Sequence, residues 1–413
     1  MGWTSPRVQR VVAAAHQTAF GTAASSGGTL ARAAGCLASE FRRGQIALDQ
    51  QGTHGSEYPR DTRAEVATMP SATLRLYAGS RAFLALLLEH ATHGQPTATS
   101  AAGDLVESGD TAAVLTTWSL TGVRPGFNTD AGNRIYVKLE DETPGAGQAR
   151  VSLYSDSART ALVAQGSAAD SSTITLAEQN SSGLSGTVAL AAPSASNLTG
   201  IQLSVVTVRP QRATIISRYF TIFRDSGQEL ETISDCTVRS LRLESSFAGG
   251  LIVEVEIVGS TYAIGASVLT PSVAAAEREV FVHAEAVVTH NANAQSVFRA
   301  VHGLGHDVIP SLANAAAPAA LWKRGSMALP IVLLTRLASE SRTIRDDGAA
   351  GTWRQIVMTY TFGPRVLSVT YPRAILVAPE LPATGDLAWE DHRLTFDARD
   401  DGTNAPVQIT LGI

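Results

Sequence analysis

The stretch Cys236–Ser260 reads CTVRSLRLESSFAGGLIVEVEIVGS, which has the plan strand, glycine-containing turn, strand. In its second strand the apolar residues alternate with Glu254 and Glu256. Because successive side chains of a strand point to opposite faces, this strand has one apolar and one acidic face. Two interpretations are open: the wall of a barrel that encloses water, or a half-exposed antiparallel sheet.

A weaker version of the same plan returns near the C-terminus. From Arg373 the chain reads RAILVAPELPATGDLAWEDHRLTFDA, which resembles the first stretch in pattern but not in identities. The turn-rich polar segments 49–66 and 342–353 form a second matching pair. We therefore expect two related β-barrel-like modules, each of ordinary domain size.

The N-terminal part of the first module combines irregular segments with one strand and one helix. The first 45 residues show little periodicity and predict an irregular arm, while 49–66 predicts a long loop of the kind that is usually functional. SATLRLYAG (Ser71–Gly79) alternates like a strand. RAFLALLLEHAT (Arg81–Thr92) predicts a short helix that packs on a sheet and ends at Gly94.

Composition changes near Pro96, where short strands separated by Gly, Asn and Ser begin. Strands of this kind indicate an immunoglobulin-like β-sandwich of about 100 residues, inserted into the first module. The predicted fold is all-β: two tandem modules with a short helix, plus the inserted sandwich. The expected boundaries are 1–96 with 212–265 for the first module, 97–211 for the insert and 266–413 for the second module.

Composition also limits the classes of function. Only 17% of the 413 residues are charged, the net charge is −5 and the pI is about 6.0. A basic stripe for nucleic acid is therefore not expected, and much of the surface is expected to be covered by other protein. Cys36 and Cys236 form no CxxC pair, so neither a disulfide framework nor a zinc site is predicted.

No secretory signal or membrane span is predicted. The most apolar run, Phe83–Leu88, is far shorter than the roughly 20 residues that cross a bilayer. The protein is expected to be made in the cytoplasm and to stay soluble until it assembles.

No pattern of catalytic residues is present, so we expect a protein that is not an enzyme and has no cofactor or metal. The best metal candidates, His302, His306 and Asp307, have glycines between them, which argues against a helix that presents both histidines on one face. They are interpreted as polar loop residues. The carboxylate pairs Asp346–Asp347 and Asp400–Asp401 are also expected in glycine-containing loops.

The order of these segments resembles a phage tail tube protein of the larger, double-module type. The segments that carry the resemblance are Cys236–Ser260 and LTFDARDDGTNAPVQITL (Leu394–Leu411). The likeness covers 1–96 and 212–413, whereas 97–211 departs from the family pattern and is expected to decorate the outside of the tube.

The resemblance implies a structural protein of the virion tail. Tail tube subunits join their sheets into rings, and the rings stack into a conduit through which genomic DNA passes without specific binding. Two modules per chain imply a trimer that imitates a six-fold ring. The implied partners are further copies of the chain, together with tape measure, tail terminator and baseplate proteins.

The resemblance also implies which residues make contacts. An acidic lumen would let DNA slide, and Glu254 and Glu256 are the expected lumen-facing residues, although the opposite orientation is open. The N-terminal arm and the 49–66 segment are expected to contact a neighbouring subunit or ring, through the following residues: Arg7, Arg10, Asp49, His54, Glu57, Tyr58, Arg60, Asp61 and Arg63.

Two other classes of function stay open. One is a baseplate, tail-completion or decoration protein that binds the host surface, which would not form long homopolymers. The other is a hydrolase with a carbohydrate-binding sandwich, which would show turnover that a point mutation abolishes.

Overall fold

The computed structural model is mostly β, with antiparallel sheets and two α-helices in the described part of the chain. None of its described helices has the length and apolar character needed to cross a membrane. The structure describes residues 11–17, 19–27, 30–33, 35–51, 61–94, 97–99, 106–107, 115–123, 134–143, 148–169, 173–180, 182–190, 196–202, 205–208, 218–247, 249–266, 269, 280–311, 320–336, 339–362, 365–380, 391–403 and 405–412.

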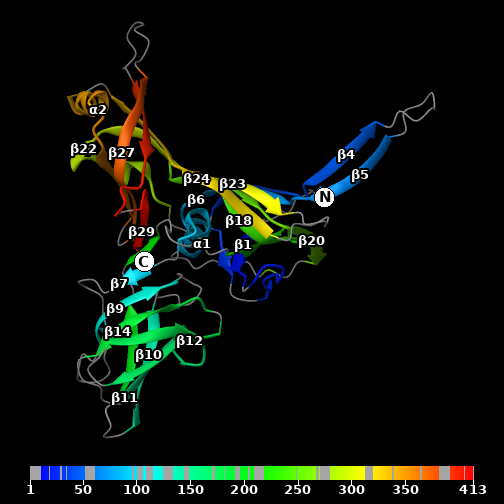
Figure 1. Cartoon of the computed structure of the whole chain (residues 1–413), viewed down its shortest axis with the longest axis vertical. Helices are drawn as coiled ribbons and strands as arrows, with labels where there is room; N and C mark the ends of the chain where they lie inside the picture. Colours follow the sequence, from blue (N-terminus) through cyan, green and yellow to red (C-terminus); the bar gives the residue numbers. More distant parts are fainter. Residues whose placement is uncertain are drawn as a thin grey trace, which may run out of the picture.

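One long curled sheet runs through the upper part of the molecule (Figure 1). Every pairing in it is antiparallel, so each strand bonds to the next as in a single ribbon. In spatial order its strands are β3 (Cys36–Arg42), β6 (Ser71–Tyr77), β19 (Ile252–Val258), β18 (Glu229–Ser246), β23 (Val297–Ser311), β25 (Pro330–Arg336), β28 (Asp391–Ala398) and β27 (Arg365–Glu380).

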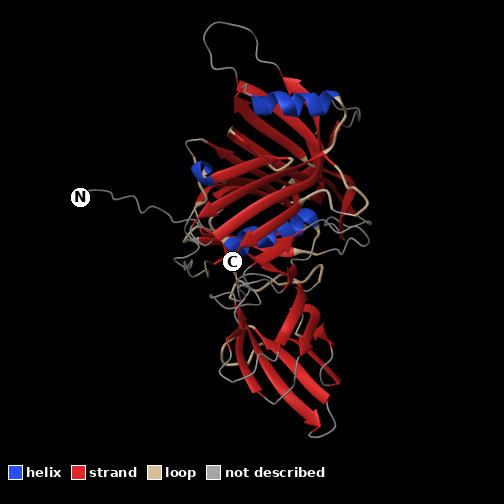
Figure 2. Cartoon of the chain, turned by 90° about the vertical axis from the view of Figure 1, so that its left-hand side faces the viewer, coloured by secondary structure: helices blue, strands red, loops and turns tan. Residues whose placement is uncertain are grey.

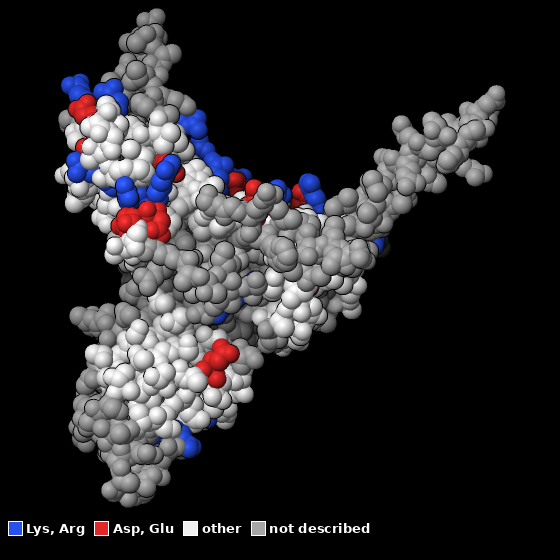
Figure 3. All heavy atoms as spheres, in the orientation of Figure 1, with Lys and Arg blue, Asp and Glu red and all other residues white. Residues whose placement is uncertain are grey.

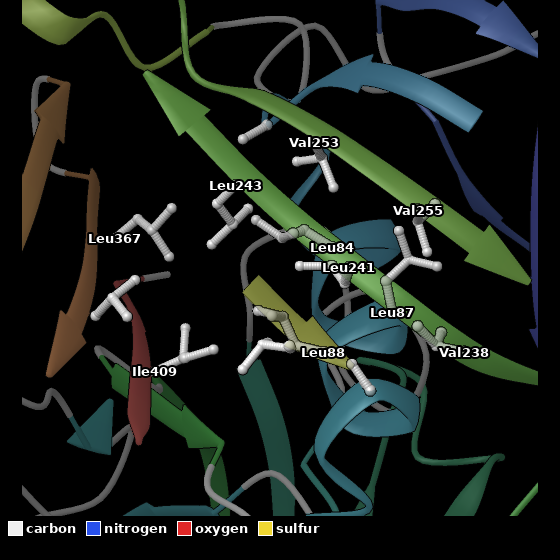
Figure 4. Close-up of a cluster of buried hydrophobic side chains, with 14 of the residues drawn as sticks. Leu84, Leu87, Leu88, Val238, Leu241, Leu243, Val253, Val255, Leu367 and Ile409 are labelled. Atoms are coloured by element: carbon white, nitrogen blue, oxygen red, sulfur yellow. The ribbon is translucent and has the colours of Figure 1, made fainter. Parts of the chain in front are cut away.

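The apolar face of this sheet packs on helix α1 (Arg81–Thr92). Leu84, Leu87 and Leu88 of α1 are buried against side chains of β18 and β19 (Figure 4). The predicted helix is confirmed. The Ser80 side chain accepts a hydrogen bond from the Phe83 N–H at its start, and the helix ends at His93, which has a left-handed φ of 53°, one residue before the expected glycine.

Further strands and helices complete two halves of the curled sheet. The first half adds β1 (Val11–His16), β2 (Ala31–Arg32), β17 (Phe220–Asp225) and β20 (Thr261–Ala266). Strands β1 to β3 show that the N-terminal region is more regular than predicted. The second half adds η2 (His283–Glu285), β21 (Ala286–His290), β22 (Asn293–Gln295), β24 (Ala320–Ala328), α2 (Ser339–Ala349), β26 (Arg354–Phe362) and β29 (Gln408–Gly412).

The two halves have the same pairing scheme. The first part of β18 lies between β17 and β20 and its last part pairs β19, while β27 pairs β26, β29 and β28 in the same way. The partner strands β1 with β17 and β3 with β6 correspond to β21 with β26 and β23 with β25. Helix α1 follows β6 as α2 follows β25.

The correspondence extends to irregularities of the strands. Three β-bulges recur at matching positions, between Phe220/Ile222 and Arg354/Ile356, between Val238/Ser240 and Leu376/Ala378, and between Cys36/Ala38 and Val297/Arg299. A bulge changes the local twist of a strand, so matching bulges keep the two halves in register residue by residue. Residues that occupy the same register position in the two halves are called equivalent below.

Two segments that were predicted as loops contain regular elements. Residues 49–51 and 61–66 lie on β4 (Gln45–Gln51) and β5 (Asp61–Thr68), which pair as a ribbon that projects beyond the sheet (Figure 1), and residues 52–60 lie outside the described part of the chain. The 342–353 segment lies mostly in α2. The predicted match between these two segments is therefore wrong, since α2 is equivalent to α1.

The hairpin β4–β5 leaves the sheet at Gly44, which has a φ of 59°. A Cβ atom at this position would lie 2.0 Å from the carbonyl oxygen of Met69, so only glycine fits the turn without a backbone shift. The equivalent residue in the second half is Gly305, where β23 turns from β25 toward β24.

A sandwich lies below the curled sheet and is joined to it by strand pairing (Figures 1 and 2). It has its own core, which includes Trp118, Leu120, Ile135 and Leu153. Val205–Val208 (β16), read from the sequence as part of the sandwich, pairs with β7 of this part and with β29 of the curled sheet, so it links the two. The remaining strands of this part are β7 (Thr97–Thr99), β8 (Val106–Glu107), β9 (Leu115–Thr121), β10 (Arg134–Thr143), β11 (Gln148–Tyr154), β12 (Leu162–Ala169), β13 (Thr173–Glu178), β14 (Ser185–Leu190) and β15 (Ser196–Gln202).

Candidate assembly edges and the charged face

The two halves of the curled sheet meet where β18 pairs β23. The register runs from Ser240 opposite Gly305 to Ser246 opposite Arg299, and it is antiparallel throughout. This pairing, called the junction below, joins the last part of β18 in one half to β23 in the other half. It makes one sheet out of the two halves.

Each outer end of the curled sheet offers the same kind of strand that the junction uses. Among the described residues, β3 (equivalent to β23) pairs only β6, so its other edge has no partner strand. Beyond Ala374, β27 (equivalent to β18) likewise pairs only β28. Leu37 on β3 and Val377 on β27 are 46% and 62% exposed. In the described part of the chain, the curled sheet therefore ends in two complementary open edges, of which the one on β27 is described as far as Glu380.

A buried chain of hydrogen bonds fixes the geometry of the junction. The Tyr360 hydroxyl lies 3.0 Å from Ser245 Oγ, and Ser245 Oγ lies 2.9 Å from His283 Nδ1. His283 Nε2 is 2.7 Å from the carbonyl oxygen of Val297, so Nε2 carries the proton and donates. Ser245 belongs to the first half and the other residues to the second half, so these bonds hold the halves in one orientation.

Apolar packing adds a second contact between the halves. The hairpin β23–β24 carries Val308 and Leu321, which are buried against Tyr219 and Val258 of the first half. Phe20 packs on the edge of the Tyr219 ring, with centroids 4.9 Å apart. The hairpin of one half is thus seated on the outer part of the other half.

The face of the curled sheet opposite α1 carries a ladder of ion pairs (Figure 3). Glu254 lies 3.2 Å from Arg75 and 3.5 Å from Arg242, and Glu256 lies 3.2 Å from Arg239. Glu244 contacts Arg242 and Arg299 at 2.8 and 2.5 Å. The strand sequence alone predicted an acidic face, but arginines from neighbouring strands pair with both glutamates, so this face is not acidic.

The same face has a different chemistry in the second half. There a shallow pocket has an apolar floor and a rim of arginines, formed by Arg242, Arg299, Val301, Val332, Leu334 and Arg393. In the first half the equivalent floor positions are held by Glu40, Thr73 and Arg75. The two halves share their backbone but not the charge pattern of this face.

The histidines that were predicted in a polar loop lie on β23 instead. His302 is buried, its ring stacks on Tyr371, and its Nδ1 atom is 3.1 Å from the Tyr371 hydroxyl. Burial lowers the pKa of His302 to about 3, so the ring is neutral at pH 7. In the part of the chain that the structure describes, no group of three or more His, Cys, Asp or Glu side chains is arranged to hold a metal.

The carboxylates predicted in loops are divided between two settings. Asp346 and Asp347 lie on α2, and Asp347 forms a two-point ion pair with Arg354. That pair lowers the pKa of Asp347, and the Arg354 side chain is the main cause. Asp400 and Asp401 do lie in a turn, where they accept hydrogen bonds from the N–H groups of Gly402 and Thr403.

The predicted contact residues are described in part. Glu254 and Glu256 lie together on the charged face, and Asp49, Asp61 and Arg63 lie on the strands of the projecting hairpin. The others lie outside the described residues: Arg7, Arg10, His54, Glu57, Tyr58 and Arg60. Sequence reasoning missed the two open edges. The sequence did contain a signal for the ion-pair ladder: Arg75 and Arg242 each alternate with apolar residues along their strands, which indicates that they lie on the polar face of the sheet.

Comparisons with known proteins identify no family. No family model matches this chain, and no curated protein is significantly similar to it. The function must therefore be argued from the edges, the charged face and the repeat.

Proposed function

We propose that the protein is a structural subunit that closes into rings, and that the rings stack into a hollow phage tail tube through which DNA passes. The observation that carries the proposal is the junction. It joins the last part of β18 in one half to β23 in the other half, and among the described residues the equivalent strands, the last part of β27 and β3, have no partner strand on their outer edges. Pairing β27 of one copy with β3 of the next repeats the junction between chains.

Unpaired sheet edges are a liability in a protein that acts alone, because they template association with other chains. Here the β27 edge of one copy would pair with the β3 edge of the next copy. A contact between two different surfaces is heterologous, so it can propagate from copy to copy around a ring. The curl of the sheet supports a closed ring over an open filament. Three chains would supply six halves, which matches a trimer that imitates six-fold symmetry.

The charged face supports a conduit role. Helix α1 covers the opposite face, so closing the curled sheet with the helices outside leaves the ion-pair ladder on the inner wall. Arginines that are paired with glutamates on the same wall are less available to neutralise phosphates, and strong DNA binding requires such neutralisation. The wall proposed here is screened by its own ion pairs and is not acidic.

The proposed role requires no catalysis, cofactor or metal. The protein is proposed to reside in the virion tail, where the sandwich that hangs below the curled sheet would face outward (Figure 2). Proteins that fix the length and the ends of the tube are its expected partners, together with further copies of itself.

Electron microscopy of the purified protein over a range of concentrations, combined with mass measurement of the particles, tests the proposal. The expected particles are hollow rings or tubes, each ring with the mass of three 43.2-kDa chains and with three external knobs. Rings of six full-length chains would contradict the module count. Monomers at every concentration would favour a baseplate or decoration protein.

A further inference from the structure

The projecting hairpin β4–β5 has an internal counterpart whose seat is visible. The counterpart is β23–β24, because Gly44 and Gly305 are equivalent and both hairpins follow the strand that they extend. Val308 and Leu321 of β23–β24 pack on Tyr219 and Val258 of the first half. Within one chain, the β23–β24 hairpin of the second half therefore packs on the first half. These are the same two halves that pair at the junction.

The equivalent seat in the second half is centred on Trp353. Tyr219 and Trp353 both directly precede equivalent strands, and Val258 is equivalent to Asp397. The Arg373 guanidinium lies 4.6 Å from the centre of the Trp353 ring, and that of Arg399 lies 5.9 Å away. Arg399 also donates to Asp397 at 3.0 Å. We call Trp353, Arg373, Asp397 and Arg399 the tryptophan seat.

The tryptophan seat lacks a cover that its counterpart has. In the first half, Phe20 covers the edge of Tyr219 from the segment that connects β1 to β2. In the second half, β21 and β22 are joined by Asn291 and Ala292 alone, so the described chain has no equivalent segment. Arg399 is exposed and its side chain keeps 68% of its accessible surface.

We propose that the tryptophan seat binds the β4–β5 hairpin of a second copy of this chain. The inference rests on the proposed function, because the copy must pair its β3 with β27 to bring its hairpin to the seat. The contact then repeats the packing of Val308 and Leu321 on the first half. It places the hairpin against a neighbour in the same ring, whereas the sequence also allowed a contact with the adjacent ring.

Charge complementarity supports this occupant over other proteins. Strands β4 and β5 contain Asp49, Asp61 and Glu65 and a single basic residue, Arg63, so the hairpin strands are acidic. The tryptophan seat has two arginines and one aspartate, and it is therefore basic around an aromatic ring. An acidic hairpin that covers this ring would keep both guanidinium groups paired.

Disulfide trapping tests the contact directly. Ala47 follows Gly44 by three residues as Val308 follows Gly305, and Asp397 is equivalent to Val258, so we expect cysteines at positions 47 and 397 to come within bonding distance across the interface. The double variant Ala47→Cys with Asp397→Cys is made in a Cys36→Ser background, because Cys236 is fully buried. We expect ladders of linked chains on non-reducing gels under mild oxidation.

The matched control keeps Ala47→Cys and moves the second cysteine to exposed Glu178 on the sandwich, and we expect at least tenfold fewer linked chains from it. A second variant, Trp353→Ala, should weaken self-association at least tenfold while the circular dichroism of the monomer is unchanged. If the unmodified protein associates but the double variant links no more than the control, the hairpin docks elsewhere and the ring proposal stands. If the unmodified protein does not associate at all, both proposals fall.

Discussion

The burial and protonation of single residues in this protein depend more on their position in the sheet than on their neighbours in the sequence. His302 directly precedes Gly303 in VHGLGHD, a stretch that read as a polar loop, yet it is one of the most buried side chains. Its Nε2 atom has no hydrogen-bond partner among the described residues. A buried imidazole that cannot gain a second partner must stay neutral, and this couples stability to pH.

The stability of the fold should therefore fall in acid through His302. Its pKa is about 3 in the folded protein and 6.5 in the unfolded chain, so the unfolded chain binds more protons between these values. The contribution is complete above about pH 6.5 and is lost as the pH falls toward 3, at up to about 1.4 kcal/mol per pH unit. Urea unfolding at several pH values should show this slope.

The matched variant is His302→Asn, which keeps a polar atom near the Tyr371 hydroxyl but does not titrate. It should be less stable at pH 7 by about 1–2 kcal/mol and lose less stability than the unmodified protein between pH 6 and pH 4. Parallel loss in both proteins would show that other groups dominate the acid response.

Among the elements, β19 shows how the two faces of the curled sheet differ. Val255 is buried against α1, whereas the next residue, Glu256, is partly exposed and paired with Arg239. The apolar face stabilises the fold by burial, and the charged face adds little, since exposed ion pairs are individually weak.

Substitution of these two neighbours separates the contributions. Val255→Ala should lower the free energy of unfolding by about 2 kcal/mol, because it removes buried methyl groups and leaves a cavity. Glu256→Ala should lower it by less than about 1 kcal/mol, and by less still in 1 M salt. Equal effects in denaturant titrations would mean that the ladder is structurally essential.

The elements that could be predicted from the sequence are those with strong local periodicity. Helix α1 and strands β6 and β19 were predicted because apolar spacing marks each of them. The β4–β5 hairpin and α2 were read as loops because polar residues and glycines hide their periods. The last parts of β18 and β27 were predicted as strands, but the strands that each of them pairs with could not be read from the sequence.

For the whole molecule, the junction gives a register for the contact between copies. Arg242 lies opposite Gly303 within the chain, and the equivalent residues are Glu380 and Arg42. Arg42→Glu or Glu380→Arg alone should weaken self-association about tenfold, since like charges then face each other. Analytical ultracentrifugation of the two single variants and of the double exchange provides the measurement.

Recovery of association in the double exchange would support the register directly. The same loss in all three variants would place another pair of residues at the contact. Arg42 pairs with Glu40 on its own strand at the exposed surface, so its reversal should leave the monomer folded.

The plan of the whole molecule could be predicted only in outline. The all-β class followed from strand patterns in the sequence. The junction did not, because it pairs residues about sixty positions apart through a register that no local pattern records. The two halves likewise match in the positions of their bulges and in the pairing of their strands. Their side chains at equivalent positions, such as Tyr219 and Trp353, differ, so the sequence shows the repeat only weakly.

The position of the sandwich has a consequence for how such a chain evolves. The sandwich follows α1, whereas α2 is followed by a tight turn into β26 at the equivalent point. A gene that encodes one half would have to carry such an appendage on every copy of the half or on none. Tandem fusion removes that restriction, so natural selection can enlarge, exchange or delete the appendage in one half while the other preserves the architecture that both share.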